Sequence, residues 1–464
     1  MTSPVPPRAR ISRMTVPPLR IGVRLLDVDD PEVVRILDVP AEMDLGRLHQ
    51  ILQLALGWTD SHLHSFSRTD PHDYGPIADQ TRWVDVPGYE EHGLEVFEDD
   101  RDENQVGIGE LLSQGSVYYE YDMGDGWVHR IDLIGEAPEP LQEGELARLI
   151  EGSSRCPLED VGGPAGWFEF KRDQLSANLW RYQQWIEFLP LAWRDLDPTV
   201  FDIDMARRQL VLLGRAGTIK FGDGTLIHTV LDEISSLSQV VLLSYGGMDA
   251  PPSDVSSDER RAFLSPFRWL IRRVGGGLPL TKAGWLPPAV VLEAVEALGW
   301  ADQVYGKGNR EEHLPRLAVL RSEMTRLGLL RKNHGLLVAT EAARRTVDDD
   351  NALWCLIVSR LATRWRGDAE RLAGGTLLLM VTSDQPLDHS RIEAIVLLSL
   401  LMRGIERSDN KPLTKRDAWW LMGDLWRLFL AVDGLVESRR VIPSTEHSTS
   451  ALRTFARDVL LYAE

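Results

Sequence analysis

Three histidines and two neighbouring acids carry the residue types of a metal or acid–base site. His62 and His64 stand two apart in "HLHSFSR", whose alternation predicts a short strand with both rings on one face. His129 follows in "GDGWVHR", and Glu159 and Asp160 follow in "CPLEDVGG". Imidazole nitrogens and carboxylate oxygens together suit a divalent metal ion. The alternative is that these histidines are satisfied by ordinary hydrogen bonds beneath a loop.

General acid–base catalysis could use His129 with Asp122, Asp125 or Asp160. Whether these side chains meet depends on the register of one predicted hairpin, "VYYEYDMGDGWVHRIDLI" at 117–134. A two-residue turn at 125–126 would place Asp122 opposite His129. A three-residue loop at 124–126 gives one coherent apolar face with His129 inward, turns Asp122 away from it, and is favoured. This favoured register pairs Met123 with Trp127, Tyr121 with His129, Tyr119 with Ile131, Val117 with Leu133 and Glu120 with Arg130.

The segments around these residues predict an α+β domain of antiparallel strands with packed helices. Strands are expected over 19–26 and 33–39, followed by a helix that Asp44 caps and Gly57 ends. The acidic stretch 70–105 is expected to be a solvated loop or edge, and 156–170 a Gly/Pro-rich connection. Further helices are predicted in 175–193 and after Asp202 or Asp204.

Three of these pieces, in this order, resemble the plasmid pRiA4b ORF-3-like family. They are "LDVPAEMDLGRLHQILQLALGWTDSHLHSF", "YYEYDMGDGWVHRIDL" and "CPLEDVGGPAGWFEF", with "FDIDMARRQL" trailing, and they cover roughly 19–210. The resemblance implies an α+β domain and a mobile-element setting in which long relatives carry the resolvase-like label TnpR. It implies no established reaction. The positions that carry the central motif are Asp122, Gly124, Asp125, Gly126 and Trp127.

The residues do not support the chemistry of a recombinase. Residues 19–60 show no serine with arginines arranged for a DNA phosphate, and no Arg-His-Arg-Tyr set can be assembled. Two positions depart from the family pattern: Met123 replaces a phenylalanine, and Val161 replaces a second cysteine. A zinc site made of two thiolates in this piece is therefore excluded.

Charge divides the chain into an acidic front and a balanced rear. The net charge is −19, but residues 1–210 hold 19 Lys+Arg and 39 Asp+Glu (19 − 39 = −20), and the rest hold 32 and 31 (+1). Two distant cysteines exclude a disulfide framework. The Pro- and Arg-rich residues 1–18 predict a disordered tail and lack the apolar core of a signal peptide. With no run long enough for a membrane span, a cytoplasmic protein without a membrane partner is expected.

The rear half predicts mainly α structure with winged-helix-like modules. A connecting segment and linker are expected at 211–258, and three helices followed by the hairpin "LLRKNHGLLVAT" are expected within 259–346. This module holds 15 basic and 8 acidic residues (15 − 8 = +7), so DNA is a candidate partner, and a protein partner is the alternative. The candidate DNA contacts are Arg310, Arg316 and Arg321 near the third helix and Arg331, Lys332 and His334 at the wing.

Residues 347–464 predict a helical domain that includes a second, degenerate winged helix. "LPLTKAGWLP" (278–287) is echoed by "KPLTKRDAWWL" (411–421), and "LGLLRKNHGLLVAT" (327–340) by "DGLVESRRVIPST" (433–445).

Three functional hypotheses follow. The first is a non-enzymatic accessory protein of a mobile element, with a front domain that binds a protein partner and a rear that binds DNA. The second is a metal-dependent enzyme that uses the front histidines and acids. The third is a protein-interaction scaffold without nucleic acid.

Overall fold

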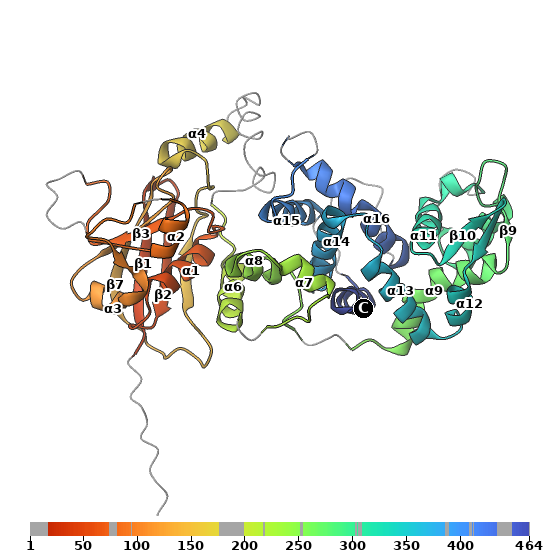
Figure 1. The fold of residues 1–464 in the computed structure, drawn as a ribbon, viewed down its shortest axis with the longest axis horizontal. Helices are drawn as coiled ribbons and strands as arrows, with labels where there is room; N and C mark the ends of the chain where they lie inside the picture. Colours follow the sequence, from red (N-terminus) through yellow and green to blue (C-terminus); the bar gives the residue numbers. More distant parts are fainter. Residues whose placement is uncertain are drawn as a thin grey trace, which may run out of the picture. The chain divides into compact units, whose positions relative to one another are not determined.

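The chain forms two compact units, seen in the computed structural model of Figure 1. The first comprises Met1–Leu189 and Leu196–Ala216, and the second Pro190–Asp195 and Gly217–Glu464. The structure describes residues 17–73, 81–93, 95–175, 199–216, 219–250, 254–301, 304, 309–385, 389–407, 411, 413–433 and 448–463. The finer division predicted at 259–346 and 347–464 stays a prediction.

An eight-stranded mixed sheet organises the first unit, with strand order β5-β4-β3-β6-β7-β1-β2-β8. Each pair of neighbours is antiparallel except β4 and β5, which are parallel. The predicted α+β class is therefore confirmed, and so is the hairpin β1–β2. The strands are β1 (Leu19–Asp29), β2 (Glu32–Val39), β3 (His64–Ser67), β4 (Arg82–Val84), β5 (Arg101–Asp102), β6 (Val117–Tyr121), β7 (Trp127–Glu136) and β8 (Arg148–Ser153).

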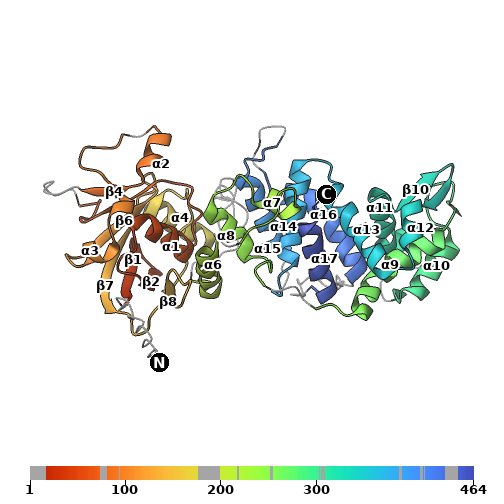
Figure 2. The same ribbon diagram turned by 60° about the horizontal axis from the view of Figure 1, so that its bottom comes forward.

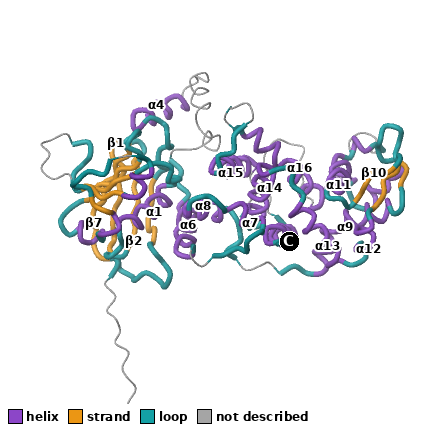
Figure 3. Tube along the Cα trace, in the orientation of Figure 1, coloured by secondary structure: helices purple, strands orange, loops and turns teal. Residues whose placement is uncertain are grey.

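Helix α1 (Leu45–Leu56) begins and ends as its sequence predicts. The Asp44 carboxylate accepts a hydrogen bond from the Arg47 amide at 2.7 Å, which satisfies one of the free N–H groups of the first turn. Gly57 ends the helix in the left-handed conformation, with φ of 88°. The apolar positions Leu48, Ile51 and Leu52 are completely buried. Figure 3 shows helix α1 in purple and the strands of the sheet in orange.

Arg35 is a fully buried cation that joins three parts of this unit. Its guanidinium donates hydrogen bonds to Ala55 O at the end of α1, to Val34 O in β2, and to Ser153 O and Ser154 O at the end of β8. The Phe201 ring lies 3.6 Å away over the same group. A buried cation is tolerated only when its donors are satisfied, so Arg35 fixes the start of the loop after β8.

The loops of the first unit carry short helices, labelled in Figures 1 and 2. Helix α4 begins inside 156–170, which was predicted to be only a connection, so that prediction was wrong for residues 163–170. Helix α6 begins after Asp202, which caps it as predicted. Apart from Leu175, the helix predicted at 175–193 lies outside the described residues. The helices are α2 (Val86–Glu91), η1 (Glu103–Gln105), α3 (Ile108–Leu112), α4 (Gly163–Leu175) and α6 (Ile203–Arg215).

The second unit is mainly helical, as predicted. A small antiparallel sheet, β10-β11-β9, lies among its helices. The three helices and the hairpin expected within 259–346 are present as α9, α10, α11 and β10–β11, while the winged-helix assignment itself stays a prediction. These elements are α9 (Ser257–Val274), β9 (Leu278–Pro279), α10 (Pro288–Ala297), η4 (Glu311–His313), α11 (Pro315–Arg326), β10 (Leu330–Asn333), β11 (Leu336–Ala339) and α12 (Glu341–Thr346).

Two further stretches differ from their expected character. The predicted connector contains two buried apolar helices, α7 and α8, and α7 packs against α14 and α17. The echoed segments adopt different structures, because 278–287 forms β9 and a turn whereas 411–421 opens α16. The second echo lies almost wholly outside the described residues. The helices are α7 (Leu226–Leu231), α8 (Ser236–Ser244), α13 (Asp350–Thr363), α14 (Asp368–Val381), α15 (His389–Met402), α16 (Lys415–Asp433) and α17 (Ser450–Leu461).

Among the described residues, no helix combines the length and the apolar character required to cross a bilayer.

Candidate metal centre

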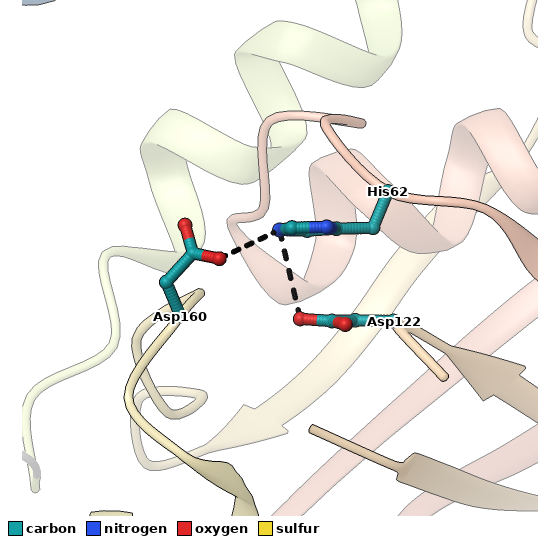
Figure 4. A group of neighbouring side chains, drawn as sticks. All are labelled: His62, Asp122 and Asp160. Carbon is teal, nitrogen blue, oxygen red and sulfur yellow. Dashed lines mark ion pairs between the residues drawn. The ribbon is translucent and has the colours of Figure 1, made fainter. Parts of the chain in front are cut away.

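His62, Asp122 and Asp160 meet at one point of the first unit (Figure 4). The Nε2 atom of His62 lies 3.5 Å from Asp122 Oδ2 and 3.3 Å from Asp160 Oδ1. The three ligand atoms lie within 4.8 Å of one another. In the part of the chain that the structure describes, no other trio of His, Cys, Asp or Glu side chains brings its ligand atoms so close.

Each of the three side chains comes from a different loop. His62 precedes β3, Asp122 follows β6, and Asp160 lies between β8 and α4. Asp122 and Asp160 adopt left-handed backbone conformations, with φ of 56° and 60°. Such angles are uncommon outside glycine and persist where surrounding contacts hold them, often at functional sites.

Two buried polar atoms in this cluster lack hydrogen-bond partners. Asp122 is buried, and its Oδ1 accepts hydrogen bonds from the amides of Gly124 and Asp125. Its Oδ2 has no such partner, and neither has Nε2 of His62, although the two atoms face each other. Burial raises the pKa of the Asp122 carboxyl group. Buried polar atoms are normally satisfied, so this pair calls for an explanation.

A hydrogen-bond network holds the residue immediately before each of the three ligands. The Glu159 carboxylate accepts hydrogen bonds from the Tyr121 hydroxyl at 2.5 Å and from the Ser61 hydroxyl at 3.1 Å. The Tyr121 oxygen in turn accepts from the Ser61 amide at 3.0 Å. Ser61, Tyr121 and Glu159 precede His62, Asp122 and Asp160 respectively, so one compact network positions all three carrier loops. The Glu159 carboxylate is thus engaged by neighbouring hydroxyl groups and lies outside the trio of His62, Asp122 and Asp160.

The hairpin loop is also locked to the loop that carries Asp160. Both carboxylate oxygens of Asp125 accept from the Gly162 amide, at 3.2 and 3.1 Å. Gly163 has φ of +68°, and a Cβ atom there would lie 2.4 Å from Asp125 O. The close approach of these two loops therefore requires glycine at position 163.

The spacing and donor set fit a divalent metal ion. Ligand atoms about 2.1 Å from an ion in tetrahedral geometry lie about 3.4 Å apart. The two distances from His62 Nε2, 3.3 and 3.5 Å, are close to that spacing. One nitrogen and two carboxylate oxygens suit zinc, manganese or iron(II). The Asp160 side chain is 76% exposed, so water would have access to the remaining coordination positions.

The register of the central hairpin differs from both registers considered above. The pairs are Tyr121 with Trp127, Tyr119 with His129 and Val117 with Ile131. This register lies two residues from the favoured one, so the alternation of faces is kept. The expected aromatic face is buried, but Met123 and Leu133, also expected on that face, are exposed. The predicted pair of Glu120 with Arg130 is wrong, because Glu120 lies opposite Val128. The cause is a five-residue loop, 122–126, closed by a hydrogen bond of 2.6 Å from the Gly126 amide to Asp122 O.

The structure separates the other two predicted histidine ligands from this centre. Because β3 begins only at His64, His62 lies in the preceding loop and the two rings do not share a site. His64 Nε2 lies 2.7 Å from Glu103 Oε2, and both residues are buried. His129 is completely buried, its edge meets the Trp58 ring with centroids 5.1 Å apart, and burial lowers its pKa to about 3.

Four further positions in the motif pieces differ in burial. Trp127 and Val161 are buried, whereas Met123 is 39% exposed. Burial raises the pKa of the single nearby thiol, Cys156, to about 11, which keeps it protonated at neutral pH.

The six basic candidates of the second unit fall into two groups. Arg310 pairs with Glu312, Arg321 pairs with the buried Glu311, and Arg316 donates to Ala431 O of α16. These three arginines are thus held within the unit. Arg331, Lys332 and His334 are all exposed on the β10–β11 hairpin.

The pairing of His62 with Asp122 was not anticipated from the sequence. The sequence offered Asp122 only as a partner of His129, because the loop length was underestimated. One feature of the sequence could have indicated this site. Each of the three motif pieces contains two adjacent polar residues: Ser61-His62, Tyr121-Asp122 and Glu159-Asp160.

The α+β domain is similar in sequence to proteins of a known family. Residues 18–205 match the model of the plasmid pRiA4b ORF-3-like protein family. An uncharacterized protein of Sinorhizobium fredii, y4hQ, is 37% identical over 145 residues, which are 31% of this chain and 67% of that protein. The chain belongs to the plasmid pRiA4b ORF-3-like family. A crystal structure of MM3350, a protein of unknown function from Methanosarcina mazei Go1, is 20% identical with a TM-score of 0.30, covering 40% of this chain and 94% of that one.

Proposed function

We propose that the first unit binds a divalent metal ion through His62, Asp122 and Asp160. The observation that carries this proposal is the buried pair of unpartnered atoms, His62 Nε2 and Asp122 Oδ2, beside a third carboxylate. An ion between them would satisfy both atoms at once. It would also offset the like charge of the two carboxylates.

The geometry favours an open site over a purely structural one. Structural zinc sites are closed by four protein ligands, whereas catalytic sites keep a position for water or substrate. Here only three protein ligands are available, and the site is open to solvent on the side of the exposed Asp160, while Asp122 is buried. A bound ion would therefore act on water or on an anionic ligand as a Lewis acid, as in the metal-dependent hypothesis. The accessory role in a mobile element and the binding of a protein partner stay predictions from the resemblance.

The test is metal content and thermal unfolding of the full chain. After dialysis against a chelator, one equivalent of zinc or manganese should bind, and an ion at 100 times its Kd should stabilise the protein by about 2.7 kcal/mol. His62→Ala should abolish both effects, because it removes the only nitrogen donor.

His228→Ala is the matched control. His228 is a partly exposed histidine of the second unit that lies 3.5 Å from Asp223, so it presents a similar ion pair away from the site. This variant should bind metal like the parent. Equal binding by the parent and by His62→Ala, or less than one equivalent bound by the parent, would refute the site.

A further inference from the structure

Three exposed cations of residues 259–346, Lys282, Arg331 and Lys332, lie at or next to the strands of the small sheet. Most arginines of residues 259–346 have carboxylate partners within 4 Å, including those on α9 and α11. Lys282, Arg331 and Lys332 have no carboxylate that close among the described residues. Arg260 also has no carboxylate that close, but its guanidinium lies over the Trp354 ring, whereas Lys282, Arg331 and Lys332 are exposed.

The hairpin β10–β11 presents two of these cations at its tip. Asn333 pairs with Leu336, so the turn consists of His334 and Gly335, with φ of 46° and 81°. Two consecutive left-handed residues form the tight turn that matches the twist of a hairpin. Arg331 and Lys332 are adjacent in β10, so their side chains leave opposite faces of the ribbon.

A second turn brings Lys282 and an exposed tryptophan beside this tip. The Leu280 amide donates to Gly335 O at 2.9 Å, which ties the segment after β9 to the hairpin turn. Thr281 and Trp285 close the second turn with two hydrogen bonds, and Trp285 is 45% exposed. Lys332 Nζ lies 4.0 Å from the position that a Cβ atom on Gly284 would occupy.

We propose that this double turn binds duplex DNA by inserting the hairpin tip between the two phosphate walls of a groove. A two-stranded ribbon fits the major groove of B-form DNA, and cations on both of its faces would meet the phosphates on either side. The deep, narrow major groove of A-form RNA does not admit such a ribbon. The arginines of α11 take no part, because Arg316 and Arg321 are held by Ala431 O and Glu311.

The experiment measures binding of the full chain to a fluorescent 20-base-pair DNA duplex by anisotropy, across a series of salt concentrations. The double variant R331A/K332A should weaken binding at low salt at least tenfold. It should also reduce the slope of log K against log salt by about 1.8, since each lost phosphate contact contributes about 0.9. Both residues are exposed strand positions, so the variant should unfold at the same temperature as the parent.

The control R344A/R345A removes the same charge from α12, which follows the opposite end of β11. Affinity should stay within twofold of the parent, and the slope should not change. Equal losses in the two variants would show that net charge alone attracts DNA, and would overturn the assignment to the hairpin. Absence of binding at low salt, or tighter binding to duplex RNA or to single strands, would overturn it as well.

Discussion

Two clusters in the first unit each combine histidine with carboxylate side chains. They differ in how completely their polar atoms are hydrogen-bonded. In the His49–His64 cluster, His49 lies 2.9 Å from the Tyr119 hydroxyl and 2.8 Å from Asp60, while His64 pairs with Glu103. In the His62 cluster, Nε2 faces two carboxylates without forming a hydrogen bond. A histidine beside an acid is therefore weak evidence for a metal site, and an unpartnered nitrogen that faces carboxylates is the better criterion. An unpartnered nitrogen alone is not enough, since Nε2 of the buried His129 is unpartnered as well.

The satisfied cluster has a defined direction of hydrogen bonding. Gln53 donates its amide proton to the Tyr119 oxygen at 2.9 Å, which leaves the Tyr119 proton for His49 Nδ1. His49 Nε2–H then donates to Asp60. The His49 and His64 rings stack with centroids 3.5 Å apart. Burial, together with the neighbouring His64 ring, lowers the pKa of His49 to about 4, so His49 is neutral at pH 7.

The largest expected effect is a loss of stability in acid that comes from the enclosed histidines. Burial lowers the pKa of His49 to about 4 and that of His129 to about 3, from an ordinary value of 6.5. Because the unfolded chain binds these protons first, stability is fully present above pH 6.5 and is lost as the pH falls towards 4. Each histidine should cost roughly 3 kcal/mol across that window.

Urea unfolding at several pH values between about 7 and 4 would measure this slope. The variant His49→Ala should lose about half of this slope, because it removes one of the two histidines whose pKa is lowered. A slope that is unchanged in His49→Ala would assign the acid sensitivity to other groups.

The next largest effect is the contrast between two alanine substitutions in chelator-treated protein. His49→Ala removes the histidine bonded to Asp60 and to the Tyr119 hydroxyl, which keeps only Gln53, and it opens a cavity, so it should cost about 2–4 kcal/mol. His62→Ala removes a ring that makes no hydrogen bond through Nε2, and it should change stability by less than about 0.5 kcal/mol. Chemical denaturation of both variants measures the difference. Comparable losses would remove the distinction between the clusters.

The smallest effect, and the sharpest, concerns Asp122→Asn. Asparagine tolerates the left-handed backbone and retains the oxygen that accepts from Gly124 and Asp125, so metal-free stability should change by about 0.5 kcal/mol or less. Because the variant loses one anionic ligand, its metal affinity should fall at least tenfold. Titration of the chelator-treated protein with zinc measures whether metal affinity falls while metal-free stability is kept. Unchanged affinity would mean that Asp122 is no ligand.

The sequence predicts the elements of this protein better than their pairing. Helix α1, with its cap at Asp44 and its end at Gly57, follows from local spacing alone, because both signals act within a few residues. The hairpin register could not be derived, because the loop length depends on the left-handed Asp122 and on its contact with residues distant in sequence. A shift of two residues preserved the faces, so the buried aromatic side chains were still predicted correctly.

The sequence predicted only part of the candidate site. His62 and Asp160 were among the proposed ligands, but His64 and His129 were grouped with them because they share residue type and nearby positions. The structure separates them through the late start of β3 and the burial of His129. Such distinctions depend on which polar atoms find partners in three dimensions, and periodicity carries no information about that.

The wide spacing of the three ligands along the chain has a consequence for synthesis of the protein. The ligands stand at positions 62, 122 and 160, so a chain emerging from the ribosome lacks the full donor set until its first third has appeared. A segment that ends before Asp160 would offer only two ligands and would not hold the ion at ordinary cellular concentrations. Metal retention would then distinguish a completed domain from an unfinished or truncated one.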